Sequence, residues 1–314
     1  MTTRDAPDHA GTARPPAASP SGNVAARVVL DPEGRLRVGW RLLAYLVAWG
    51  AVVTTAGAVV VGRSPSPARQ AAGLVAVPAC LAVTVVFRRI VDRRPWSTVG
   101  LPWPAGGDVL GAAAGFATGV VVITALVAIE WAAGWIRVAA TPVTGEGVAG
   151  VAALLGGGLA LQLAAGFTEE LAFRGYVFCN LAERLPLRSA VALTGLLFAA
   201  GHLPGVPSPL LGLHVLVGGL AISTLWVLTR LSTSTLWPAI GMHAAWNWAE
   251  QSLFGLTTGQ VGGGLLRVER TGPAGLIGHD QPETGLVFTV AEVVLVAAYW
   301  LSVRRRGMTG WPQD

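Results

Sequence analysis

The sequence predicts an all-α, polytopic integral membrane protein with about eight transmembrane helices. Hydrophobic residues make up 53% of the 314 residues and charged residues only 12%. An average soluble domain has about 25% charged residues. Long apolar runs separated by arginines recur along the chain, and most of them reach the roughly 20 residues that a helix needs to cross a bilayer. These features exclude an ordinary soluble domain.

Eight apolar segments are candidate spans, near residues 38–61, 70–87, 108–135, 149–178, 189–203, 209–229, 235–254 and 284–302. The fifth is short for a crossing and ends at His202, just before Pro204. Residues 1–36 are rich in Ala, Pro, Ser and Arg and lack an apolar core, which predicts a disordered cytoplasmic tail instead of a cleavable signal peptide. A membrane domain over 37–306 and a short cytoplasmic tail, 307–314, complete the expected organisation.

The arginines predict the orientation of these spans, since the chain contains no lysine. With the N-terminus inside, the inner segments hold fifteen arginines and the outer segments five, while Arg41 and Arg174 fall within helices. The positive-inside rule therefore favours a multi-pass protein of the cell membrane with both termini in the cytoplasm. Because the arginines flank helices and do not form one patch, we expect the lipid bilayer and not a nucleic acid as the partner.

The stretch FTEELAFRGYVF, residues 167–178, places Glu169, Glu170 and Arg174 inside the fourth span. Each such charge at the bilayer centre costs roughly 3 kcal/mol, and charges at this depth mark functional sites by default. Glu170 and Arg174 are four residues apart, so they share a helix face and are expected to form a supporting ion pair. Glu169 is rotated by about 100° and keeps no dedicated cation.

Other polar side chains in the predicted spans complete a hydrolytic set. His202 ends the fifth span, and His243 and Asn247 lie one helical turn apart in the seventh. In this interpretation Glu169 is the general base for a water molecule, and His202 orients that water or binds a metal. His243 and Asn247 stabilise the oxyanion of the tetrahedral intermediate. The pattern assigns no role to Glu250 or Glu292.

Three motifs, Glu169-Glu170-xxx-Arg174, Phe198-xxx-His202 and His243-xxx-Asn247, follow one another on three helices. In this order they resemble the motifs of the CAAX prenyl protease and bacteriocin-processing family, also called CPBP or Abi, and they lie within residues 147–254. The family comprises intramembrane endopeptidases. The resemblance implies that Glu169, His202, His243 and Asn247 carry the chemistry, and that the substrate is a peptide or protein in or at the membrane.

The sequence leaves the metal and two other function classes open. Glu169, His202 and His243 match a catalytic zinc site in ligand type, but they lack the HExxH spacing that makes such a site specific. The family is commonly labelled metalloprotease, and a metal-free glutamate mechanism is also argued for it. A proton-coupled transporter also places Glu, His and Asn inside a bundle, although no duplicated half with broken helices is apparent here. A non-enzymatic immunity or scaffold protein is the third possibility.

The fifteen-to-five arginine distribution gives a topology prediction. Reporter fusions placed after Arg306 and within residues 88–94 should both report a cytoplasmic location. A fusion at either position that reports an outside location would show that the span count or the orientation is wrong.

Overall fold

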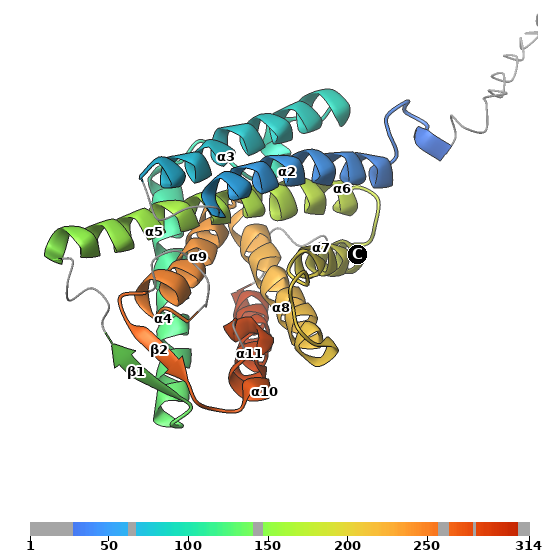
Figure 1. Cartoon of the computed structure of the whole chain (residues 1–314). Coiled ribbons are helices and arrows are strands. Elements are labelled where there is room, and N and C mark those ends of the chain that lie inside the picture. Colours follow the sequence, from blue (N-terminus) through green and yellow to red (C-terminus); the bar gives the residue numbers. More distant parts are fainter. Residues whose placement is uncertain (1–27, 62–66, 141–146, 257–263, 279–280, 307–314) are drawn as a thin grey trace, which may run out of the picture.

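The structure, a computed structural model, describes residues 28–61, 67–140, 147–256, 264–278 and 281–306, and most of them are helical (Figure 1). The α-helices are α2 (Val38–Val61), α3 (Pro67–Val86), α4 (Gly106–Ala132), α5 (Gly147–Glu170), α6 (Phe178–Ala182), α7 (Leu187–Gly201), α8 (Pro209–Thr233), α9 (Trp237–Trp248), α10 (Ala274–Ile277) and α11 (Leu286–Arg306). Three π-helical segments, Phe87–Val91, Leu171–Val177 and Ala249–Leu253, extend α3, α5 and α9. Two 3₁₀ turns lie at Trp96–Val99 and Pro282–Thr284. The all-α prediction is confirmed.

A helix lies at each of the eight predicted spans, but two of these helices are shorter than a usual membrane crossing. Six helices of the described residues are long and apolar enough to cross a membrane. The other two are α7, which has only 15 residues because it ends before Pro204, and α9. Helix α9 has 12 residues and carries polar side chains along its length. These two exceptions bear the predicted catalytic residues His202, His243 and Asn247.

The helices form two groups that cross at a large angle (Figure 1). Helices α2, α3 and the continuous α5–α6 unit lie side by side in one layer. In the second group α4 packs along α9, and α7 and α11 both pack against α8. Helix α9 also packs on α5, so it joins the two groups. The largest cluster of buried apolar residues lies between them.

Glycines bring α4 and α9 unusually close together. A methyl group added at Gly115 would overlap the carbonyl oxygen of Pro238, and one at Gly119 would lie 2.7 Å from that of Met242. From the other side, Gly241 faces the backbone of Ala112. Small residues spaced by four allow such backbone contact between helices in a membrane, where packing replaces the hydrophobic drive of water.

Segments predicted to share a side of the membrane lie next to one another. On the inner side, the backbone N–H of Leu236 donates to the carbonyl of Gly100 (2.7 Å), and Arg184 pairs with Asp31 (2.7 Å). On the outer side, β1 (Ile136–Ala140) and β2 (Arg267–Arg270) form an antiparallel ribbon in which Ile136 faces Arg270 and Val138 faces Val268. The ribbon, with a register irregularity between Val138 and Ala140, has no counterpart in the sequence prediction.

Both predicted tails lie largely outside the described residues. Of the tail predicted over 1–36, the structure describes residues 28–36, and these are folded. Leu30 and Leu36 form an isolated antiparallel bridge around a turn. Asp31 accepts a hydrogen bond from the backbone N–H of Arg35 (2.8 Å), which explains why this short polar stretch is ordered. The predicted tail 307–314 lies entirely outside them.

A buried carboxylate, Asp92, ties together the ends of four helical segments that the arginine distribution predicts to be cytoplasmic. Tyr176 and Asn180 donate hydrogen bonds to it, both at 2.9 Å. Arg88 pairs with it at 3.1 Å and Arg41 at 3.3 Å, and the side chains of Asp92 and Arg41 are completely buried. Arg88 has a second carboxylate partner, Glu183, at 2.9 Å. Asp92, Arg41 and Arg88 are therefore buried together, and the second anion, Glu183, is partly exposed and also approaches Arg94 at 3.5 Å.

We expect Asp92→Asn to lower stability strongly, because it leaves Arg41 and Arg88 with one carboxylate between them. Breaking a buried pair by removing one partner costs roughly 3–5 kcal/mol. Thermal unfolding in detergent measures the effect. The matched control is Glu269→Gln, which removes the exposed Arg137–Glu269 pair of the ribbon (3.0 Å) and should cost only about 0–1 kcal/mol. Equal shifts for the two variants would contradict a structural role for Asp92.

Candidate active site

The site begins where α5 changes its winding. Helix α5 ends at Glu169 and Glu170 and continues without a break into the π-helical segment Leu171–Val177, which contains Arg174. π-Helical turns inside α-helices occur frequently at functional sites. Every residue of this π-helical segment is buried. The two carboxylates therefore stand at the boundary between an accessible α-helix and a fully buried turn.

Glu170 has two partners on one oxygen. Its Oε1 accepts a hydrogen bond from Nη1 of Arg174 at 2.9 Å, and the predicted ion pair is therefore present in the structure. The same oxygen lies 2.8 Å from Nδ1 of His243 on α9. The side chains of Glu170 and Arg174 are fully buried. Glu170 is thus more than a partner for Arg174, because it also fixes the ring of His243.

This contact sets the tautomer of His243. A carboxylate only accepts hydrogen bonds, so Nδ1 of His243 must carry the proton directed at Glu170. Nε2 of the neutral ring is then an acceptor on the opposite side. The arrangement is that of a histidine oriented by a buried carboxylate, which recurs in hydrolytic enzymes.

Glu169 faces the free nitrogen of this histidine. Its Oε2 lies 3.8 Å from Nε2 of His243, which is too long for a direct hydrogen bond. That oxygen is buried and has no hydrogen-bond partner among the described residues. The Glu169 side chain as a whole is 24% exposed, whereas that of Glu170 is not exposed at all. A gap of this length between two polar atoms suits one bridging water.

Two aromatic rings hold the charged residues in place. Trp226 of α8 stacks on the His243 ring, with centroids 4.3 Å apart and planes 15° from parallel. The guanidinium of Arg174 lies 4.2 Å from the ring centre of Phe198 and 4.6 Å from that of Trp226. Such cation–π contacts stabilise a buried cation that has only one carboxylate partner. Sequence reasoning missed Trp226, because no spacing signal distinguishes it among twelve tryptophans.

His202 and Asn247 do not join this cluster directly. His202 caps the end of α7, its Nδ1 lies 2.9 Å from the carbonyl oxygen of Phe198, and its side chain is exposed. The Phe198 ring contacts both histidines, with centroids 4.6 Å from His202 and 6.2 Å from His243, so it lies between them. Asn247 lies one turn beyond His243 on α9, is half-buried, and makes no hydrogen bond to another described side chain.

The predicted zinc ligands do not form a three-ligand site. Among the described residues there is no group of three or more His, Cys, Asp and Glu that could hold a metal ion. Glu169 and His243 approach each other, but no contact joins His202 to either of them. A catalytic zinc needs about three protein ligands at roughly 2.0–2.2 Å from the ion. The residues as placed do not fit this requirement.

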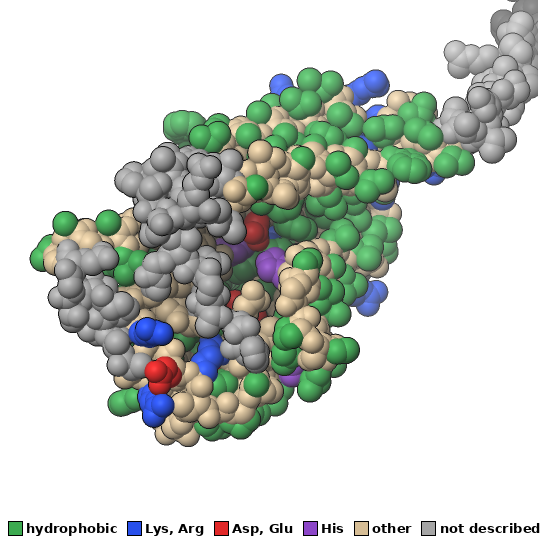
Figure 2. All heavy atoms as spheres, viewed as in Figure 1, with side chains coloured by type: hydrophobic (Ala, Val, Ile, Leu, Met, Phe, Trp, Pro, Cys, Tyr) green, Lys and Arg blue, Asp and Glu red, His purple; other side chains and the backbone are tan. Residues whose placement is uncertain are grey.

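Carboxylate and histidine side chains also lie in a hollow of the protein surface. Figure 2, viewed as Figure 1, shows carboxylate and histidine side chains inside a depression between the α5–α6 unit, α9 and α8. The surface around the upper part of this depression is mostly hydrophobic. The polar side chains in this depression are thus bordered by apolar ones, an arrangement typical of polar sites within membrane proteins.

The site can now be compared with known proteins. Residues 151–249 match the Rce1-like family. The family is described as type II CAAX prenyl endopeptidase, Rce1-like. The match confirms the resemblance to CAAX prenyl proteases that the three motifs predicted. No curated protein matches the chain by sequence. The Rce1-like segment is about a third of the chain, yet it contains every residue of the site described above.

Glu170→Gln should lower both stability and activity, because it leaves Arg174 buried without an anion and His243 without a charged partner. A loss of roughly 3–5 kcal/mol is expected. The double variant Glu170→Gln with Arg174→Gln removes both charges, so thermal unfolding in detergent should show recovered stability while activity stays low. A double variant no more stable than Glu170→Gln would contradict the proposed pairing.

Proposed function

We propose that this protein is an intramembrane endopeptidase that hydrolyses peptide bonds of membrane-associated substrates with a water activated by Glu169. The observation that carries the proposal is the 3.8 Å gap between Oε2 of Glu169 and Nε2 of His243. The other ring nitrogen of His243, Nδ1, is held by its hydrogen bond to Glu170. The match of residues 151–249 to the Rce1-like family supports the same reaction class.

In the proposed reaction, a water in this gap donates one hydrogen bond to Glu169 and one to Nε2 of His243. Glu169 takes the first proton while the water oxygen attacks the peptide carbonyl carbon. The carbonyl oxygen becomes an oxyanion, and the tetrahedral intermediate then loses its C–N bond as the nitrogen takes the proton back from Glu169. The products are an amine and a carboxylic acid, which then loses its proton to water to become a carboxylate.

The oxyanion needs donors on the other side of the carbonyl. Because His243 directs its proton at Glu170, we assign it to the water and not to the oxyanion, unlike the expectation from sequence. Asn247 keeps an uncommitted amide one turn away on α9, and it supplies the oxyanion donor in this scheme. His202 has Nδ1 held by the Phe198 carbonyl and its other nitrogen available, so it serves the substrate at the exposed rim.

No step of this scheme is assigned to a metal. The family description names CAAX prenyl endopeptidases, and a prenylated cysteine near a C-terminus anchors such substrates to the membrane. We therefore place the substrate at the membrane surface, with its cleaved bond reaching into the hollow of Figure 2. This placement requires no lipid group to enter the polar cluster itself.

Glu169→Gln should abolish cleavage and leave folding nearly unchanged, because the amide keeps the shape but cannot accept the proton. Loss of a general base lowers the rate by about 10²–10⁴-fold. Fluorogenic peptides with and without a prenylated cysteine, presented in lipid vesicles, measure the rate, and Glu269→Gln is the control on an exposed carboxylate.

Normal cleavage by Glu169→Gln would refute the role of that residue as the base. A scaffold or transporter would show no Glu169-dependent cleavage of any peptide. The same assay tests zinc: an active preparation that is insensitive to chelators and contains no metal excludes it, whereas activity lost with a chelator and restored by zinc contradicts the metal-free scheme.

A further inference from the structure

A second cavity lies behind the catalytic helices. It has a volume of about 260 Å³ and lies between α4, α8, α9 and α11. Its lining residues are Thr118, Gly119, Val122, Leu225, Met242, Trp246, Leu295, Ala298, Tyr299 and Ser302. Two of them are sequence neighbours of site residues: Met242 precedes His243, and Leu225 precedes Trp226. The cavity therefore lies next to the helix segments that carry His243 and Trp226, but it shares no lining residue with the candidate active site.

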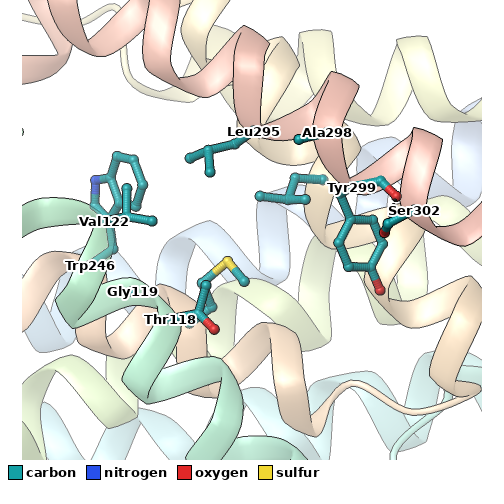
Figure 3. A pocket seen from close by; sticks show the side chains of 10 residues that line it. Thr118, Gly119, Val122, Trp246, Leu295, Ala298, Tyr299 and Ser302 are labelled. Atoms are coloured by element: carbon teal, nitrogen blue, oxygen red, sulfur yellow. Dashed lines mark hydrogen bonds between the residues drawn. The ribbon is translucent and has the colours of Figure 1, made fainter. Parts of the chain in front are cut away.

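The cavity has an apolar end and a hydroxyl-bearing end (Figure 3). Trp246 and Val122 lie at one end, while Tyr299 and Ser302 lie at the other, with Leu295 and Ala298 along α11 between them. The Tyr299 hydroxyl is 2.6 Å from that of Ser232. A volume of about 260 Å³ is below the roughly 300–1,000 Å³ of pockets for compact drug-sized ligands, and it suits a single slender chain.

A cationic side chain, Arg305, lies beyond the hydroxyl-bearing end of the cavity on the same face of α11. Leu295, Ala298, Tyr299 and Ser302 are spaced as one face of α11, and Arg305, three residues after Ser302, follows on that face. Arg305 is exposed. Arg304 is rotated about 200° from Ser302 and lies over the Trp300 ring, 5.0 Å from its centre. This end also belongs to the side that the arginine distribution predicts to be cytoplasmic, where anionic lipids concentrate.

We propose that this cavity binds one acyl chain of an anionic phospholipid, whose phosphate pairs with Arg305. The four walls come from helices set among membrane spans, so acyl chains are the apolar ligand present at highest concentration around them. The chain lies along α11 from Ser302 towards Leu295 and Trp246. The headgroup remains at the interface, where the long side chain of Arg305 reaches it.

Binding can be measured directly on the full chain in detergent micelles. The probe is phosphatidylglycerol with brominated acyl chains, which quenches tryptophan fluorescence on contact, and Trp246 lines the cavity. We expect saturable quenching by this lipid and at least fivefold weaker binding of brominated phosphatidylcholine. Non-saturable quenching, or equal binding of the two lipids, would overturn the proposal.

Two pairs of variants locate the site. Ala298→Phe fills the cavity and should weaken binding at least fivefold, whereas Val293→Phe, on an exposed face of the same helix, should not. Arg305→Gln should weaken binding of phosphatidylglycerol at least fivefold, and Arg304→Gln less than twofold. Thermal unfolding identifies any misfolded variant. If Ala298→Phe does not fold, the comparison of Arg305→Gln with Arg304→Gln decides the question, because both arginines are exposed. Equal losses of lipid binding for the two variants of either pair would contradict the assignment of the lipid to this cavity.

Competition separates a structural lipid from other occupants. Excess unlabelled phosphatidylglycerol should displace the brominated lipid, while a prenylated peptide should not. Displacement by the peptide would mean that the cavity takes substrate, and tighter binding of a brominated fatty acid would mean that the headgroup plays no part. Either result overturns the proposal. The readout is binding alone, so it does not depend on whether the protein cleaves peptides.

Discussion

A single buried oxygen, Oε1 of Glu170, organises the centre of this protein. It receives Arg174 from its own helix and His243 from another, so one carboxylate links the two helix groups. Taking these charges out of water is costly, and only mutual pairing with aromatic contacts offsets that cost. The surrounding helices must therefore hold Phe198 and Trp226 against Arg174, because retreat of either ring would remove one of the two cation–π contacts that supplement its pair with Glu170.

The same principle operates at the inner ends of the helices, but with a different purpose. Asp92 is surrounded by two arginines, a tyrosine and an asparagine, and it has no accessible oxygen for a substrate. Glu170 is equally buried, whereas the side chain of its neighbour Glu169 is 24% exposed. These two groups of buried charges differ in access: the one around Asp92 is closed and fixes helix ends, whereas the one around Glu170 has a partly exposed carboxylate, Glu169, beside it.

Sequence reasoning identified what helical periodicity determines. Glu170 and Arg174 share a face whether the turn is α or π. The alternation of sides that the arginines indicate stays a prediction. It could not decide which carboxylate meets His243, because adjacent residues differ only by rotation and the partner helix is remote in sequence. Asp92 escaped notice because its neighbours, Arg88, Arg89, Arg93 and Arg94, indicate a simple cytoplasmic loop. The apolar segments are shortest at α7, which ends before Pro204, and at α9, which contains His243 and Asn247.

The close approach of α4 and α9 fixes the part of the candidate active site that α9 carries, whereas the part at the end of α7 can adjust. The backbones of α4 and α9 are in contact at Gly115, Gly119 and Gly241, so α9 cannot rotate about its axis. His243 and Asn247 therefore keep a fixed direction. His202 stands instead at the free end of α7, followed by a short turn to Ser208, which caps α8. If the proposed function holds, we expect any adaptation to substrates of different size to come from the His202 rim, while His243 and Asn247 keep their positions.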